Sequence, residues 1–118
     1  MQVKRTYRTN GQRDKVYFYN EDGSLNMVCI YDPKTDVECK RWVYESDRIV
    51  AKYFKHDDSI LSKIEYYDKT EAKFLENGEP AIKIFGEYGK IIEKMYAKNG
   101  KLYSEKEFNE MAAKDWVN

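Results

Sequence analysis

Residues able to act as nucleophiles, general bases or metal ligands are few in this sequence and lie far apart. His56 is the only histidine, and Asp57 and Asp58 follow it directly. A histidine beside carboxylates could act as a general base or as one ligand of a metal ion. The three residues lie between two apolar segments, where a hairpin turn is expected, and a solvated turn residue is the simpler interpretation of His56.

The two cysteines, Cys29 and Cys39, flank a polar turn at 32–36. If this hairpin centres on residue 34, the two cysteines lie opposite each other, close enough for a cross-strand disulfide. A reducing compartment argues against that bond, and two cysteines with one histidine are too few for a zinc site. We therefore expect two small buried thiols, with a redox pair as the open alternative, and neither a metal nor a cofactor.

Paired carboxylates are the other possible source of catalysis, because an acid and a base can share one reaction. Such a pair needs one member in a cleft that raises its pKa, and nothing in the sequence indicates a cleft. Every pair lies in a predicted turn: Glu21/Asp22, Asp57/Asp58 and Glu76/Glu79. We expect no catalytic residue, and this chain is predicted not to be an enzyme.

Aromatic residues interleaved with basic ones form the strongest functional pattern. The chain has 11 Tyr, 5 Phe and 2 Trp, more rings than one small core needs, and some must lie on the surface. Tyr, Trp and Arg dominate the energetic centres of protein interfaces, although rings also pair across strands inside a sheet. Six residues are predicted to bind a protein partner: Tyr17, Tyr19, Arg41, Trp42, Tyr44 and Tyr53.

A nucleic-acid interface is the alternative, since rings can stack on bases while cations contact phosphates. The whole chain has 21 basic and 21 acidic residues, so its net charge supplies no field to attract a polyanion. The first fifteen residues are the exception, with Asp14 as their single acid. Their basic residues are the alternative candidates: Lys4, Arg5, Arg8, Arg13 and Lys15.

Short segments of β-branched and aromatic residues, separated by turn residues, predict antiparallel strands joined as a meander. Asn-Gly and Asp-Gly steps supply the positive φ that tight hairpins need. The segment at 72–89 is the least regular. Strands are predicted at 2–9, 13–19, 24–31, 37–44, 48–54, 60–67, 72–75, 81–85 and 90–96.

The end of the chain changes to a helical period. Ser104 and Glu107 have the spacing of a capping box, in which each side chain bonds to the backbone of the other residue. Phe108, Met111, Ala112 and Trp116 then recur at spacings of three and four, as on one face of a helix. We predict a helix at about 104–117 whose apolar stripe packs on one face of the sheet.

An internal repeat links two parts of the predicted sheet. The segment that begins Tyr17-Phe18 and continues to Tyr31-Asp32-Pro33-Lys34-Thr35 returns 36 positions later from Tyr53-Phe54 to Tyr67-Asp68-Lys69-Thr70. This pattern resembles the tyrosine-rich tandem repeats of the YwqK-type antitoxin and MORN-like families, and a related bacterial repeat family of unknown function. The resemblance covers about 13–70, and it implies protein–protein contact without catalysis.

Together these patterns predict one α+β, mostly β domain over 1–118: an antiparallel β-hairpin meander, curved, at about 2–96, packed with one C-terminal helix. With 118 residues there is room for one core. We find neither a signal peptide nor an apolar segment long enough for a membrane, and expect a cytoplasmic protein.

The predicted function is a non-catalytic protein-binding module. A small immunity or inhibitor protein fits best, such as an anti-CRISPR-like inhibitor of host defence carried by a mobile element. It would act by occluding an unidentified protein partner in a phage–host or toxin–immunity interaction. A homodimer formed through exposed sheet edges is also possible.

Overall fold

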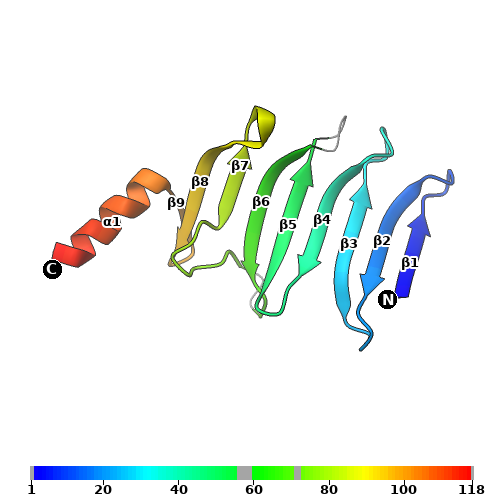
Figure 1. The fold of residues 1–118 in the computed structure, drawn as a ribbon, viewed down its shortest axis with the longest axis horizontal. Helices are drawn as coiled ribbons and strands as arrows, with labels where there is room; N and C mark the ends of the chain where they lie inside the picture. Colours follow the sequence, from blue (N-terminus) through cyan, green and yellow to red (C-terminus); the bar gives the residue numbers. More distant parts are fainter. Residues whose placement is uncertain (1, 56–59, 71–72, 118) are drawn as a thin grey trace.

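The computed structural model describes residues 2–55, 60–70 and 73–117, with side chains described up to residue 114. Nine strands form one open, curved sheet in which every strand is antiparallel to its neighbour in sequence (Figure 1). The strands are β1 (Gln2–Tyr7), β2 (Arg13–Tyr19), β3 (Leu25–Tyr31), β4 (Glu38–Tyr44), β5 (Arg48–Phe54), β6 (Leu61–Asp68), β7 (Ile82–Phe85), β8 (Ile91–Lys98) and β9 (Lys101–Ser104). The predicted hairpin meander is confirmed.

The least regular segment contains one wrong strand prediction. No strand forms at 72–75 within the described residues, and Phe74 makes only an isolated bridge to Tyr67 of β6. The sheet also extends past residue 96, because β9 adds four residues after the Asn99-Gly100 turn. Those two residues have φ of 53° and 78°, the left-handed pair that a two-residue hairpin requires.

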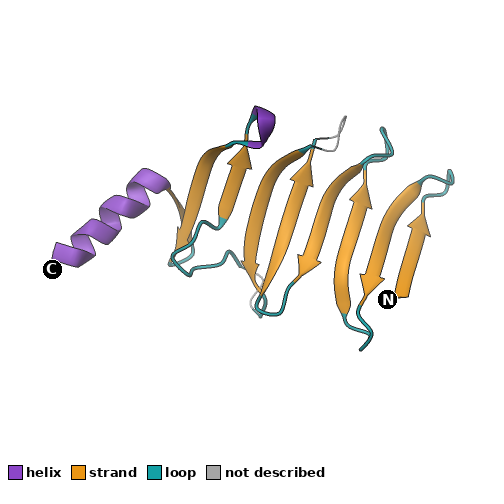
Figure 2. Cartoon of the chain, viewed as in Figure 1, coloured by secondary structure: helices purple, strands orange, loops and turns teal. Residues whose placement is uncertain are grey.

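The sheet is a single layer over most of its length (Figure 2). The molecule measures 59 × 36 × 21 Å, and its radius of gyration is 17.2 Å, whereas a compact domain of this length has about 13–14 Å. The exposed surface is 8106 Å², compared with roughly 6,700 Å² for a compact protein of this mass. Both faces of the sheet therefore lack a covering layer over most of the strands.

Burial in this sheet comes from neighbouring side chains on the same face. The most buried residues are small: Ala51 and Val50 of β5 are 0 % and 3 % exposed, and Ala81, directly before β7, is 0 % exposed. Longer side chains on adjacent strands lean over these positions and exclude water. The core is thus a line of small apolar residues within the plane of the sheet.

Most hairpins carry a β-bulge two residue pairs from the turn. In each case one extra residue on the second strand has no direct partner, which bends the strand and strengthens its twist. The extra residues are Asp14, Asn26, Cys39, Ser62 and Ile92.

The bulges correct the alignment of the repeat. Beside each bulge, Phe18 pairs with Met27 in the first unit, and Tyr53 pairs with Lys63 in the second. Tyr53 is therefore equivalent to Phe18 and not to Tyr17. The equivalent hairpins, β2–β3 and β5–β6, are three strands apart. Because neighbouring strands run in opposite directions, the turns of these two hairpins lie at opposite edges of the sheet, and equivalent residues lie on opposite faces.

The C-terminal helix α1 (Glu105–Val117) begins where the capping box predicts. The Ser104 amide donates to Glu107 Oε1 at 3.2 Å, and the Glu107 amide donates to Ser104 Oγ at 3.2 Å. The helix contacts β8 and β9, and its Phe108 ring stacks on Tyr96 with centroids 4.4 Å apart. Within the predicted apolar stripe, Phe108 and Met111 are half-buried and Ala112 is exposed, while the Trp116 side chain lies outside the described part of the helix. Among the described residues, no helix is both long and apolar enough to cross a membrane.

We expect Glu107→Ala to destabilise the first helical turn by about 1 kcal/mol, because it removes one half of the capping box. Glu107→Gln keeps an acceptor of the same length and is the matched control. Amide hydrogen exchange of residues 104–108 measures the difference. Equal protection in both variants would show that the reciprocal bonds do not stabilise the turn.

Candidate functional site

One face of the sheet gathers most of the residues predicted to bind a partner. Directly paired residues share a face, and side chains alternate between faces along a strand. The register places Tyr17 and Trp42 in one row, which continues to Ala51. Tyr19, Tyr44 and Tyr53 each lie two residues further along one of these strands and therefore share the same face. We call this surface the aromatic face. It carries Tyr17, Tyr19, Lys40, Trp42, Tyr44, Tyr53, Lys63, Glu65, Tyr67 and Phe74.

Arg41, the sixth predicted partner-binding residue, lies on the opposite face, since it adjoins Trp42 in β4. Its guanidinium makes a two-point contact with Glu38, with Nη2 to Oε1 at 2.6 Å and Nε to Oε2 at 2.9 Å. The structure therefore separates Arg41 from the five aromatic candidates.

Rings at the centre of the aromatic face contact one another across strands. Tyr67 stacks on Phe74 with centroids 5.0 Å apart, and its other neighbour is Trp42 at 5.8 Å. Tyr17 and Tyr19 stack at 6.5 Å nearer to β1. Such pairs add to the stability that their buried area provides, so the rings are held in place before any partner arrives.

Two lysines lie over these rings. Lys40 Nζ is 4.3 Å from the Trp42 centroid and 4.7 Å from that of Tyr53, and Lys63 Nζ is 4.3 Å from the same tyrosine. A cation over a ring face is attracted by the ring quadrupole. The Lys40 ammonium group is thereby held above an apolar surface, and that of Lys63 lies between the Tyr53 ring and the Glu65 carboxylate.

Glu65 is the buried polar group of this site, with 7 % of its surface exposed. It accepts a hydrogen bond from the Tyr67 hydroxyl at 2.9 Å and forms an ion pair with Lys63 at 3.6 Å. Its cross-strand partner is Ala51, whose small side chain leaves room for the carboxylate. Sequence reasoning missed Glu65, although a lone acid in the apolar run 64–67 is a signal that could have indicated it.

A hollow of about 200 Å³ continues the aromatic face toward β9. Apolar atoms dominate its lining, and Tyr67 and Phe74 form one wall while Ala97 and Leu102 form the other. A cavity of roughly this size accepts a benzene-sized group. The hollow can hold one apolar side chain of a partner.

The alternative basic candidates are divided by the structure. Lys4 and Lys15 lie on the aromatic face, whereas Arg5 lies on the opposite face, paired with Val16. Arg8 is engaged by Asp14 at 3.3 Å and donates to the Tyr31 carbonyl at 2.9 Å.

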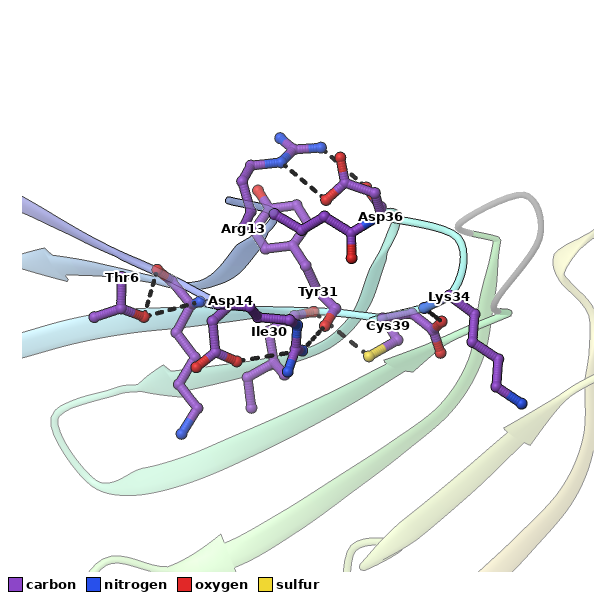
Figure 3. A network of polar contacts seen from close by, with 12 residues as sticks. Thr6, Arg13, Asp14, Ile30, Tyr31, Lys34, Asp36 and Cys39 are labelled. Atoms are coloured by element: carbon purple, nitrogen blue, oxygen red, sulfur yellow. Dashed lines mark hydrogen bonds and ion pairs between the residues drawn. The ribbon is translucent and has the colours of Figure 1, made fainter. Parts of the chain in front are cut away.

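The exposed Arg13 side chain bonds to the β3–β4 turn (Figure 3). It contacts Asp36 Oδ1 at 3.5 Å, donates to the Asp36 carbonyl at 3.0 Å, and lies 4.2 Å from the Tyr31 ring centroid. These contacts tie the first two turns at this edge together. The five N-terminal cations therefore form no common surface.

The cysteines do not face each other. Cys29 pairs with Arg41, and Cys39 is the extra residue of a bulge. The Cys39 thiol donates a hydrogen bond to the Ile30 carbonyl at 3.5 Å. Both thiols are free, but of the two predicted buried thiols only Cys29 is buried, since Cys39 is half-buried. The assumed hairpin centre at residue 34 is wrong. Burial, with the nearby Glu38, raises the pKa of Cys29 to about 11, and burial also raises the pKa of Cys39.

The remaining catalytic candidates gain no support from geometry. No group of three or more potential metal ligands occurs among residues 2–55, 60–70 and 73–117. His56, Asp57 and Asp58 lie outside the described residues.

Charge is segregated in this neutral molecule. The strands carry 13 basic and 5 acidic residues, and the remainder of the chain carries 8 basic and 16 acidic ones. The sheet faces are therefore positive, although the whole chain is neutral. Neutral net charge does not exclude an anionic ligand here, because the field near a face depends on the charges on that face.

No protein-family model, curated protein or solved structure matches this chain.

Both cysteines should react slowly with iodoacetamide near pH 8, because the thiolate is the reactive form and both pKa values are raised. Mass spectrometry of the native and the denatured protein measures the labelling rates. Rapid labelling of Cys29 in the native protein would contradict the burial that the structure gives it.

Stability should fall as the pH rises from 10 to about 12. Burial, followed by the bond to Glu65, raises the pKa of Tyr67 to about 12 in the folded protein from 10.0, and the pKa of Tyr53 is raised for the same reasons. The unfolded chain therefore loses these protons first, so the stability that the neutral phenols provide is complete below pH 10 and is lost above it.

Chemical unfolding at a series of alkaline pH values measures this dependence. Tyr67→Phe should flatten it, whereas Tyr88→Phe, whose ring is 95 % exposed, should leave it unchanged. If the stability of the Tyr67→Phe variant falls equally steeply with pH, Tyr67 is not the cause of the pH dependence.

Proposed function

We propose that this chain is a non-catalytic protein-binding module whose aromatic face binds a partner protein. The observation that carries this proposal is the meeting of five sequence-predicted residues on one uncovered face: Tyr17, Tyr19, Trp42, Tyr44 and Tyr53. Rigid aromatic side chains make strong interface contacts because they lose little conformational entropy on binding. Packing against one another fixes these rings further.

The size of the surface supports a stable complex. A standard interface buries about 800 Å² on each partner. This molecule exposes 8106 Å², roughly 1,400 Å² more than a compact protein of its mass. Its two longest dimensions are 59 and 36 Å, so one broad face is large enough for such an interface.

The partner should combine an apolar anchor with carboxylates. The hollow beside Tyr67 and Phe74 accepts the anchor, while Lys40, which lies over the Trp42 and Tyr53 rings, is positioned to meet an acidic group. A lysine that lies over an aromatic surface is partly desolvated, and it therefore binds a carboxylate more strongly than a lysine that extends into water.

The biological role that best fits these features is that of a small immunity or inhibitor protein, including an anti-defence inhibitor carried by a mobile element. Such a protein acts by occlusion, which requires a broad face and no catalytic residues. The tyrosine-rich repeat supports this role through its resemblance to antitoxin-type repeats. Pairing of a second copy along the free β1 edge is the alternative use of the sheet.

Trp42→Ala should weaken partner binding at least about 30-fold, because a central aromatic anchor contributes about 2 kcal/mol or more. Phe18→Ala removes a half-buried ring of the opposite face and is the matched control. The partner is first captured from lysate with nuclease present and identified by mass spectrometry. Its affinity for each purified variant is then measured by calorimetry.

Loss of binding in Trp42→Ala together with retention in Phe18→Ala supports the proposal. Equal loss in both variants, or capture that disappears with nuclease, would contradict it. Sedimentation of the protein alone, showing a dimer that Trp42→Ala leaves intact, would instead support pairing of two copies through the edge strand.

A further inference from the structure

Cations lie side by side on the face opposite the aromatic one. Arg41 pairs directly with Lys52, Lys83 pairs with Lys94, and Ile64 connects the two pairs as the partner of both Lys52 and Lys83. We call Arg41, Lys52, Lys83 and Lys94 the cation row. It crosses five neighbouring strands, so it is about 19 Å long at the usual strand spacing.

This arrangement opposes the stability of the sheet. Like charges directly opposite each other on neighbouring strands are destabilising. A third such pair, Lys98 with Lys101, lies on the same face further along the sheet. Departures from a local rule that stabilises the fold are expected at functional sites.

The aromatic face shows that the sequence can avoid such pairs. Its lysines occupy an equally long row, but Ile30 separates Lys15 from Lys40, and Tyr53 separates Lys40 from Lys63. Among the described strand pairs, all cations that are directly opposite each other therefore lie on the face opposite the aromatic one.

Much of the charge in the row is uncompensated. Neither Lys52 nor Lys94 forms an ion pair within the part of the chain that the structure describes. Lys83 donates to the Tyr66 hydroxyl at 3.4 Å, a neutral partner. Arg41 is paired with Glu38, so an acid lies at the β4 end of the row.

Rings border the cation row on this face. Arg41 lies 5.5 Å from the Phe54 centroid, and Lys83 lies 5.2 Å from that of Tyr66. Nucleic-acid bases stack on exposed rings while their phosphates meet cations. An acidic peptide would use the cations alone.

We propose that the cation row binds single-stranded nucleic acid, with phosphates along Arg41, Lys52, Lys83 and Lys94 and bases against Phe54 and Tyr66. The length of the row fits about four to six nucleotides. This site lies on the face that the proposed protein partner does not use, so the chain can hold a protein and a nucleic acid at once. It replaces the N-terminal cations as the nucleic-acid surface.

Fluorescence anisotropy with a labelled oligothymidine of about 12 nucleotides tests the proposal over a series of salt concentrations. Four phosphate contacts predict a slope near −3 for the logarithm of the association constant against that of the salt concentration. Lys52→Gln/Lys94→Gln should halve this slope and weaken binding on the order of 50-fold at low salt. Lys4→Gln/Lys15→Gln makes the same charge change on the aromatic face and should preserve binding.

Thermal unfolding separates a binding role from a structural one. Removal of repelling charges should hold or raise the melting temperature of Lys52→Gln/Lys94→Gln while its affinity falls. A clear fall in melting temperature would mean that these lysines support the fold, and it would overturn the proposal. Equal loss of affinity in the control pair would overturn it as well.

The contribution of the rings distinguishes nucleic acid from other polyanions. Phe54→Leu should weaken oligothymidine binding about tenfold through lost stacking and leave the salt slope unchanged. Polyglutamate of similar length should bind at least tenfold more weakly than the oligonucleotide. Equal affinity for polyglutamate, or no effect of Phe54→Leu, would assign the row to an acidic protein segment and contradict the proposal. Because these variants leave Trp42 intact, failure here does not affect the protein-binding test.

Discussion

A sheet without a second layer can be stabilised only within its own plane. Each strand of this protein is held by backbone hydrogen bonds to its neighbours and by side chains that lean over one another on the same face. The residues that exclude water completely, Ala51 and Ala81, are small because larger neighbours must close over them. Aromatic and long basic side chains are suited to this task, since they cover area sideways and keep a polar end in water.

The same constraint explains why the candidate site is rigid. Cation–π contacts and ring stacks such as Lys40–Trp42 and Tyr67–Phe74 provide the lateral packing that a second layer would normally supply. Glu65 is buried beneath them with the Tyr67 hydroxyl and Lys63 as partners. A carboxylate paired in this way fixes the positions of its neighbours, because moving either of them would leave a buried charge without compensation. Stability and preorganisation for binding therefore arise from the same contacts.

Charge in this molecule is ordered by structure and not by sequence. The chain is neutral, yet its strands hold 13 basic and 5 acidic residues. Acids collect in turns, where Asp and Glu accept backbone hydrogen bonds, as Asp32 does from the amides of Lys34 and Thr35. Lysine and arginine remain on the strands, where their aliphatic stems cover neighbouring rings. Neutrality overall therefore coexists with two positive faces, each with a different spacing of its cations.

Local patterns in the sequence determined most of the elements. Strand periodicity predicted 13–19 and 48–54 to the residue, the Asn99-Gly100 step adopted its expected turn, and Ser104 with Glu107 formed the predicted cap, because each of these signals depends on neighbours in the chain. Tertiary structure alone decided the bulges, and with them the register that separates Cys29 from Cys39. One extra residue reverses the face of every side chain beyond it. The length of a hairpin does not reveal where that residue lies, so the composition of each face, and the burial of Glu65, became visible only in the folded sheet.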